Sequence, residues 1–468
     1  MKTSETQQSA TVPTANKPNS CLPRPIQRRQ FLKSAAMIGA GGLILPRLKL
    51  FGADAPSNKL NIALIATGHR AKDHFEVMSH ENVVALCDIN EQHLASAATK
   101  FPKAKQYADW RKCLEQKDID AIVCCTLDHT HAFVTNWAMN RGKHVYCEKP
   151  LVNTVEEARL IRATWLKNKD KLATQVGTQR HQFKNFNRVR ELIRNGAIGE
   201  LQEVSAWGNR QERRAGFLPS EGNPPSYINY DLWLGPSPFH PYNSEYFRGG
   251  CLRWDMYWDF GSGQVGDMGS HTMDLAWNAI DAGLPTSAEG KGEPFNPDVT
   301  PVTLETYFEI PANDWRKPIL VSWHQGGALP DSPNRGIDLK KIDHGVMFEG
   351  TKGFLVADFN TRILIPQNND TNHEEADMSY YKPRSKADDI PAMGNFQQEW
   401  INACKGSLKT SCNFGYATDM IEMMLLGLVA YRAGRKIQYD GASGSITDCA
   451  EASQYLRHTY REGWTLNG

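Results

Sequence analysis

The sequence predicts two consecutive domains, a doubly wound parallel α/β sheet over residues 56–181 and an α+β domain with an open, mainly antiparallel sheet over 182–468. The first prediction rests on short apolar runs that alternate with helical stretches, because continuous apolar strands are typical of parallel sheets covered on both faces. The second rests on the change after Gln182 to strand-like segments followed by helices. With 468 residues, 40% of them hydrophobic, the chain is long enough to build two cores.

The periodicity of the apolar residues places the elements of the first domain. Buried strands are expected at 60–65, 83–87, 121–125 and 144–147, with helices over 71–79, 92–100 and 132–141 between them. A helix over 155–168 and a short strand within 171–176 are expected to complete the sheet.

The second domain begins with a helix over 186–195 that ends at Gly196. Strands are expected at 201–206, 303–310, 319–325, 345–349 and 353–358, and a polar surface excursion at 364–391. Helices over 395–405 and 416–434 follow, and packing of these helices back on the first domain is one expectation. The Gly/Pro/Trp-rich stretch at 208–262 is too long for a simple connector, which favours a functional role.

Residues 1–55 have the three parts of an export signal in the expected order. Arg28-Arg29 precedes the apolar run at 35–45, and Ala53-Asp54-Ala55 follows it. The alternative is a basic tail beside a chance apolar run. The apolar run is too short for a bilayer span of about 20 residues, so no integral membrane segment is expected. The order predicts a Tat-type signal cleaved near Ala55 and a protein exported to the periplasm or beyond.

Charge and cysteine usage exclude two classes of function. The net charge is +1, and no basic run follows Lys49, so a nucleic-acid partner is not expected. The ten cysteines form no C-x-x-C or Cys/His ligand spacing, and most lie in apolar runs, which indicates buried thiols rather than a zinc site. Asp128, His129 and His131 stand close together, but helix capping explains Asp128 and Thr130 as well, and no metal is predicted.

The turn after the first strand indicates a dinucleotide. The run from Ala66 to Ala71 occupies the place of a G-x-G-x-x-G turn, with alanine at the first and third glycine sites. Gly68 keeps the middle site, where the backbone approaches a pyrophosphate at a helix N-terminus. Asp88 ends the next strand 20 residues later, where a carboxylate accepts the ribose 2′-hydroxyl of NAD and repels the extra phosphate of NADP. The alternative for Asp88 is an ordinary turn residue. The cofactor predicted is therefore NAD rather than NADP.

Two further strand ends are expected at the same edge of the sheet, where ligands of doubly wound folds bind. One is Thr126-Leu127-Asp128-His129-Thr130-His131, and the other is Glu148-Lys149-Pro150. Lys149, fixed by the following proline, would lie over whatever binds there.

These motifs resemble the Gfo/Idh/MocA oxidoreductase family, and with the export signal they resemble its exported bacterial branch. The resemblance continues through 176–181, 196–200, 231–236, 258–263 and 266–271, although Leu127 stands where the family usually has proline. It implies a Rossmann domain, with Lys149 holding the reacting hydroxyl and the nicotinamide ribose. It also implies His271 as general base, with Asp267 as its neighbour or as a substrate ligand.

The site residues predicted on this basis fall into two sets. The cofactor set is Ala66, Gly68, His69, Arg70, Asp88, Thr126, Leu127, His129, His131, Glu148, Lys149 and Gln179. The substrate set is Arg180, His181, Tyr257, Trp258, Asp267 and His271.

The chemistry of the residues agrees with these roles. Asp267 and His271 are four residues apart, so on a helix they share one face. A histidine titrates near neutrality and can take a hydroxyl proton, and an adjacent ammonium would stabilise the developing alkoxide. A buried histidine held by Asp267 is the structural alternative. Trp254 and Trp258 would either stack on a sugar or belong to the core.

Three functions are compatible with these predicted residues. The first is an NAD-dependent oxidoreductase acting on a sugar or glycoside hydroxyl. The second is an NAD-dependent glycosidase with transient oxidation, for which Tyr230, Tyr257 or His181 would supply a second acid. The third is a noncatalytic nucleotide-bound sugar sensor. Because an exported enzyme meets no obvious pool of soluble NAD, a tightly bound, recycled nucleotide is one solution. An apolar sheet face covered by another subunit would give a homodimer or homotetramer.

Overall fold

The computed structural model describes residues 58–333, 337–366, 390 and 393–467. The predicted export signal at 1–55 and most of the predicted excursion lie outside these residues. The start of that excursion is a correction, because Leu364–Pro366 belong to strand β13 (Arg362–Pro366), which pairs with β12 (Gly353–Ala357). Within the described residues, no helix is both long and apolar enough to cross a membrane.

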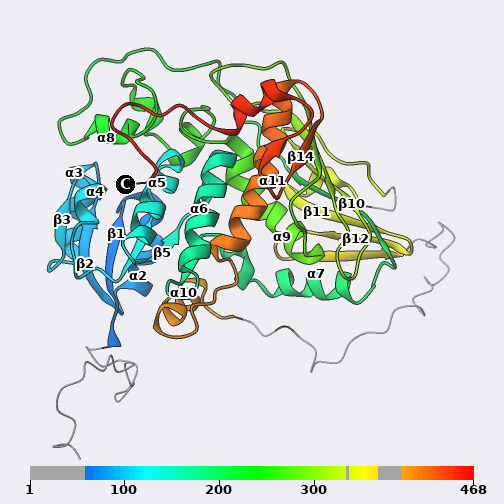
Figure 1. The fold of residues 1–468 in the computed structure, drawn as a ribbon, viewed down its shortest axis with the longest axis horizontal. Helices are drawn as coiled ribbons and strands as arrows, with labels where there is room; N and C mark the ends of the chain where they lie inside the picture. Colours follow the sequence, from blue (N-terminus) through cyan, green and yellow to red (C-terminus); the bar gives the residue numbers. More distant parts are fainter. Residues whose placement is uncertain (1–57, 334–336, 367–389, 391–392, 468) are drawn as a thin grey trace, which may run out of the picture. The chain divides into compact units, whose positions relative to one another are not determined.

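The first sheet has six parallel strands in the order β3-β2-β1-β4-β5-β6, as predicted for a doubly wound fold (Figure 1). The strands are β1 (Asn61–Ile65), β2 (Asn82–Cys87), β3 (Lys105–Tyr107), β4 (Ala121–Cys124), β5 (His144–Cys147) and β6 (Thr174–Val176). The helices are α2 (Phe75–Met78), α3 (Glu91–Lys100), α4 (Trp110–Cys113), α5 (Asp128–Asn140) and α6 (Val155–Asn168). The short elements β3 and α4 were not predicted, because three or four residues show no periodicity.

One helix of the first domain differs from its prediction. Residues 71–79 do not form a continuous α-helix, because a 3-10 helix at His69–His74 precedes a single α-helical turn at α2. The reason lies in the turn before it, where Ala66 and His69 have φ values of 66° and 44°. Two left-handed residues turn the chain sharply, so no regular α-helix begins at this point.

The second sheet has nine strands in the order β13-β12-β11-β7-β10-β9-β8-β14-β15. Its remaining strands are β7 (Leu201–Gly208), β8 (Ser287–Gly292), β9 (Leu304–Ile310), β10 (Ile319–Gln325), β11 (His344–Gly350), β14 (Ile437–Asp440) and β15 (Ser445–Ile446). Its helices are α7 (Lys184–Arg194), α8 (Tyr230–Leu234), α9 (Ser270–Ile280), α10 (Phe396–Lys405) and α11 (Phe414–Ala433). Strands β7 and β10 pair in parallel, and the other pairs of this sheet are antiparallel, which confirms the mainly antiparallel prediction.

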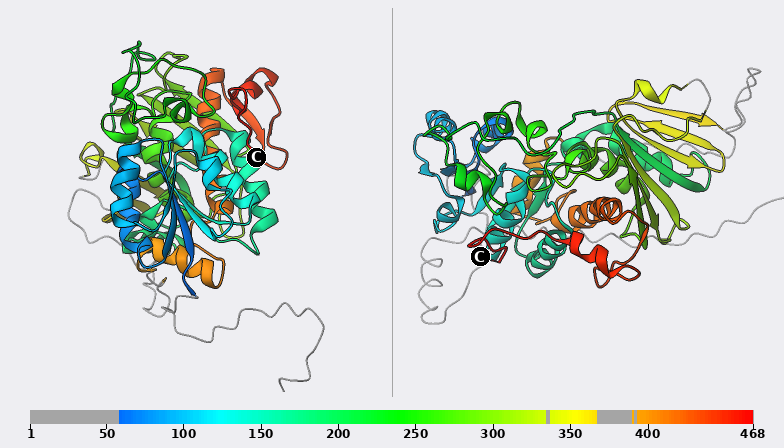
Figure 2. Two further views of the ribbon diagram at one scale, coloured as in Figure 1. Left: turned by 90° about the vertical axis from the view of Figure 1, so that its left-hand side faces the viewer. Right: turned by 90° about the horizontal axis from the view of Figure 1, so that it is seen from above.

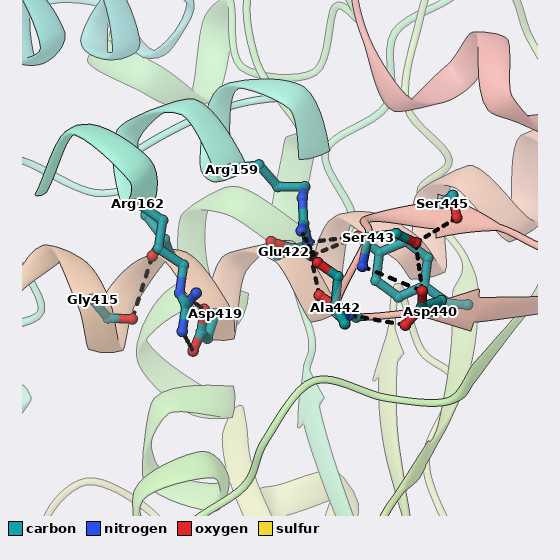
Figure 3. A network of polar contacts seen from close by, with 12 residues as sticks. Arg159, Arg162, Gly415, Asp419, Glu422, Asp440, Ala442, Ser443 and Ser445 are labelled. Carbon is teal, nitrogen blue, oxygen red and sulfur yellow. Dashed lines mark hydrogen bonds and ion pairs between the residues drawn. The ribbon is translucent and has the colours of Figure 1, made fainter. Parts of the chain in front are cut away.

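Helix α11 joins the two halves of the described structure. It packs against α6 on one side and against β8 and β9 on the other (Figures 1 and 2). Figure 3 shows two arginines of α6 that reach α11: Arg159 Nη1 lies 2.9 Å from Glu422 Oε1, and Arg162 Nε lies 2.6 Å from Asp419 Oδ1. Helix α11 thus contacts α6 of the first domain.

The far face of the second sheet is partly covered by the chain itself. Alternate residues of each strand face opposite sides, so Val204 and Phe348 enter the main core while Trp207 and Met347 face outward. Trp207 and Met347 form a small core with Leu339 and neighbours from the connection before β11. The chain itself covers this part of the face, and oligomerisation stays a prediction.

Candidate active site

A cavity of about 570 Å³ lies at the C-terminal edge of the first sheet. The turns after β1, β2, β4 and β5 form one wall, and segments of the second domain at 246–254 and 267–271 form the other. All predicted cofactor residues except His129 line this cavity, as do Arg180, Asp267 and His271 from the substrate set.

The turn after β1 has a glycine-like backbone in spite of its alanine. Ala66 has a φ of 66°, a left-handed conformation that costs a non-glycine residue roughly 1–2 kcal/mol. At Gly68 a Cβ would lie 2.3 Å from Nδ1 of His93, so this backbone position is open only to glycine unless His93 moves. His93 lines the cavity and was not predicted, although its place in the first turn of the helix after Asp88 could have suggested it.

Asp88 ties the ends of the first two strands together. Its Oδ2 accepts hydrogen bonds from the Thr67 backbone N–H at 2.7 Å and from Thr67 Oγ1 at 3.0 Å, and its Oδ1 accepts one from the Asn90 N–H at 2.8 Å. The buried carboxylate also lines the cavity. A glycine backbone beside an open cavity, with a carboxylate at the next strand end, fits the predicted dinucleotide.

The two histidines after β4 have different surroundings. Nδ1 of His131 lies 2.6 Å from the Pro150 carbonyl oxygen and its Nε2 lies 3.0 Å from that of Thr126, so it connects the turns after β4 and β5. His129 faces away, with Nε2 3.0 Å from the Trp233 carbonyl oxygen, and burial lowers its pKa to about 4. The prediction of His129 as a cofactor residue is wrong in position, because successive residues of α5 point to different sides of the helix.

Asp128 begins α5 without a side-chain capping bond, so the capping explanation for it is wrong. It lines the cavity instead, and burial raises its pKa well above the ordinary range. Thr130 does bond to the turn, since its Oγ1 donates to the Leu127 carbonyl oxygen at 2.8 Å.

Glu148 is the buried anchor at the end of β5. Its Oε1 lies 2.8 Å from His74 Nε2 and 3.1 Å from Arg70 Nε. Burial alone would raise the pKa of this carboxyl, but the hydrogen bond and charge of His74, followed by the charges of Arg70 and Lys149, lower it to about 2. Glu148 is therefore ionised and holds the backbone that presents Lys149.

Lys149 reaches across the cavity into an ion-pair network. Its Nζ pairs with Asp267, whose other oxygen pairs with Arg210. Asp267 is 5% exposed, so one buried carboxylate holds two cations at the cavity wall. Arg210 was not predicted, although it lies in the 208–262 stretch to which the sequence assigns a function.

His271 stands in the first turn of α9 and lines the same cavity. Asp267 precedes it in a π-helical turn, Val265–Gly269, so the spacing of four residues is right but the helix type is not the predicted α-helix. Nδ1 of His271 is buried and has no hydrogen-bond partner among the described residues. Burial, followed by the charges of Lys149 and Arg180, lowers the pKa of His271 well below its ordinary value, so the imidazole is neutral.

Three predicted substrate residues lie outside the cavity. His181 is buried with Nε2 2.7 Å from Asp274 Oδ2 and stacks on Phe186. Tyr257 stacks on a phenylalanine, and the indole N–H of Trp258 donates to the Asn296 carbonyl oxygen at 2.9 Å. These residues were predicted as substrate contacts because they are close in sequence to the motifs. In the structure each of them packs in the core instead. Trp254, in contrast, lines the cavity.

Asp255 is a third residue that the sequence analysis missed. It is 2% exposed, and its Oδ1 has no hydrogen-bond partner among the described residues. Burial raises the pKa of Asp255 to about 7 in spite of Lys149 and Arg210. Ligand atoms of Asp255, Asp267 and Cys251 lie within 4.8 Å of one another, but the two cations already on Asp267 oppose binding of a metal ion there.

Comparison with protein families gives two matches in chain order. Residues 60–176 match a model described as an oxidoreductase family with an NAD-binding Rossmann fold, and residues 214–289 match the model of a C-terminal alpha/beta domain of the same family.

Curated relatives match about a third of the chain. An inositol 2-dehydrogenase of Klebsiella pneumoniae subsp. pneumoniae is 35% identical over 146 residues, which is 30% of this chain and 43% of the relative. A myo-inositol 2-dehydrogenase of Thermotoga maritima is 28% identical over 145 residues, 30% of this chain and 42% of the relative. The chain thus spans less than half the length of these relatives.

Solved structures extend the likeness to both domains. The WlbA dehydrogenase from Bordetella pertussis, in complex with NADH and UDP-GlcNAcA, has a TM-score of 0.57 at 16% identity over 82% of this chain and 99% of that one. Levoglucosan dehydrogenase in complex with NADH and levoglucosan has a TM-score of 0.53 at 17% identity over 81% and 99%. At these identities the likeness shows a shared fold.

Proposed function

We propose that the chain is a Gfo/Idh/MocA oxidoreductase, as the matches of residues 60–176 and 214–289 to two domain models of that family indicate, and that it is an NAD-dependent dehydrogenase of a sugar or polyol hydroxyl. The observation that supports the proposal is one cavity shared by two sets of residues. Gly68 and Asp88 lie in one part of it, and Lys149, Asp267 and His271 in another. The similar proteins named for inositol and levoglucosan support a polyol or sugar as substrate.

Gly68, Asp88 and Thr126 are the residues we expect to hold the cofactor, which when bound supplies a nicotinamide ring that accepts a hydride from carbon. Asp88 would accept a hydrogen bond from the ribose hydroxyl, and the backbone at Gly68, which has no side chain, would let the pyrophosphate approach.

His271 is the base in this proposal. Its Nδ1 has no partner among the described residues, and burial with the surrounding cations keeps it neutral, so it can accept the proton of the substrate hydroxyl. Lys149 stabilises the negative charge that develops on the substrate oxygen. Asp267 holds Lys149 and Arg210 in place.

The test is a steady-state assay of purified protein with NAD and a panel of polyols, sugars and glycosides. If the protein is a dehydrogenase, NADH should form in an amount equal to an oxidised product. This NADH formation should be lost in Lys149→Met and His271→Asn. A His80→Asn variant, at an exposed position after α2, is the matched control and should keep full activity. Absence of NADH with every member of the panel would contradict the proposal, and it is what a noncatalytic sensor predicts. Full activity of either site variant would also contradict the proposal.

A glycosidase that oxidises its substrate transiently is the second candidate, and Asp128 favours it. Such a reaction needs a proton donor for the departing oxygen, and neither Tyr230, Tyr257 nor His181 lines the cavity. Asp128 does, and burial keeps its carboxyl protonated. The glycosidase predicts free sugar from aryl glycosides without net NADH, with cleavage lost in Asp128→Asn.

We further propose export through a Tat-type signal and assembly as a homodimer or homotetramer. Export is supported by Arg28-Arg29, the apolar run and Ala53-Asp54-Ala55. It predicts a mature N-terminus near residue 56 in the exported fraction and retention of an Arg28→Lys/Arg29→Lys variant in the cytoplasm. Light scattering on the mature protein tests the assembly.

A further inference from the structure

The charges around His271 do not balance within the described protein. Lys149, Arg180, Arg70 and Arg210 are the cations near it. Asp267 pairs with Lys149 and Arg210, and Arg70 pairs with Asp73 and Glu148. Arg180 forms no ion pair or side-chain hydrogen bond with any described residue, and the only charge that perturbs it is another cation, Arg70. Arg180 is half-buried, and a cation partly withdrawn from water without a counter-charge is costly, so this one indicates a ligand.

Arg180 is held in position by aromatic rings rather than by acids. It lies in the 3-10 helix Gln179–Gln182 that follows β6, and it lines the cavity. The centre of its guanidinium lies 4.4 Å from the ring centroid of Phe359 and 5.2 Å from that of Phe183. Stacking fixes the plane of the group and leaves its N–H edge for a planar, doubly accepting partner.

Two neighbouring groups are also without partners. Oε1 of Gln179 and Nδ1 of His271 are buried and unpaired, as is Nε of Arg180, and all three residues line the same cavity. Unpaired buried polar atoms are rare in native proteins, and three around one cavity indicate a polar ligand.

The cofactor phosphates do not explain Arg180. In the sheet order β1-β4-β5-β6, Arg180 follows a strand three places from the turn that carries Gly68. At about 4.8 Å between neighbouring strands, the two strand ends are roughly 14 Å apart. The charge of Arg180 also lowers the pKa of His271, which places Arg180 beside the half of the cavity where the substrate would lie.

We propose that the substrate is an acidic sugar and that Arg180 binds its single negatively charged group, a carboxylate as in a hexuronate or a sulfate ester. The inference rests on the proposed dehydrogenase function and names its substrate class. One unpaired cation suits one negative charge. A bound anion would also leave the Lys149–Asp267–Arg210 network undisturbed.

The test is calorimetric binding to the NAD-loaded protein. The probes are D-glucuronate, D-galacturonate and D-mannuronate, each compared with its uncharged methyl ester, and D-glucose 6-sulfate compared with D-glucose. At least one acid should bind roughly tenfold to a hundredfold more tightly than its neutral counterpart. A preference confined to the sulfate would identify a sulfated sugar, and one confined to a uronate a carboxylated one.

Two variants assign the preference to Arg180. Arg180→Met should reduce it to less than twofold while the affinity for NAD changes by less than threefold. Arg435→Met removes an exposed arginine that pairs with Asp448 beyond α11, and it should keep the full preference. The proposal is overturned if no charged probe binds, if neutral probes bind equally well, or if Arg180→Met weakens NAD to the same extent.

NADH formation in the same samples separates the two proposals. NADH from neutral sugars without a preference for acids would leave the dehydrogenase standing and overturn the acidic substrate. Arg180-dependent binding of an acid without NADH would support the acidic ligand and overturn the dehydrogenase.

Discussion

Replacing Gly177 by alanine should destabilise the protein through Glu148. Gly177 follows β6, and a Cβ there would lie 2.5 Å and 2.9 Å from the two carboxylate oxygens of Glu148. The carboxylate cannot turn away without leaving His74 and Arg70, which hold it at 2.8 Å and 3.1 Å. A pKa of about 2, against an ordinary value of 4.5, corresponds to about 3 kcal/mol of interaction with the charged form. We therefore expect Gly177→Ala to cost about 2–3 kcal/mol.

Urea unfolding of four proteins measures this cost: wild type, Gly177→Ala, Glu148→Ala and the double variant. In the Glu148→Ala background the added Cβ meets empty space, so Gly177→Ala should then cost less than about 1 kcal/mol. Gly283→Ala is the matched control, because nothing lies within 4 Å of its added Cβ. An equal cost of Gly177→Ala in both backgrounds, or a cost below that of the control, would refute the reasoning.

Three further predictions concern charged groups in the cavity or beside it. Lys149→Met should lower kcat/KM of sugar oxidation by about a hundredfold to a thousandfold, yet shift the melting temperature by less than about 4 °C because Arg210 still pairs with Asp267; a large loss of stability would show a structural role instead. The wild type should bind NAD at least about a hundredfold more tightly than NADP by calorimetry, and Asp88→Asn should reduce that ratio below about tenfold; equal affinities in the wild type would contradict the role of Asp88. Asp255, with its raised pKa of about 7, keeps a proton that the unfolded chain loses near pH 4, so its contribution to stability is lost as pH rises from about 4 to 7, by at most about 1.4 kcal/mol per pH unit. Melting curves of Asp255→Asn should lack that decline, and identical pH profiles would contradict it.

The sequence predicted those elements whose own residues show a clear period. The bounds of β5, α6 and β10 agree with the predictions, because each is a regular apolar pattern closed by a clear cap or turn. The turn after β1 was also identified, and Ala66 adopts there the left-handed backbone that glycine usually supplies.

The remaining site residues depend on contacts between distant segments. His129 and His131 are two histidines in the same turn of α5, and the sequence does not tell which of them faces the cavity. The direction of the helix decides that His131 lines the cavity and His129 does not. Arg210 and Asp255 come from a stretch without periodicity, and they approach Lys149 through the packing of the second domain on the first. No local pattern specifies such positions, because they result from tertiary packing.

The most direct test of the central claim follows one hydrogen atom. A sugar that is oxidised in the steady-state assay is prepared with deuterium on its ring carbons and incubated with the protein and NAD, and the NADH is analysed by mass spectrometry. Hydride transfer in the cavity predicts NADH that carries one deuterium, in an amount equal to the oxidised sugar, and its loss in His271→Asn. Oxidised sugar accompanied by unlabelled NADH, or by no NADH, would contradict the claim.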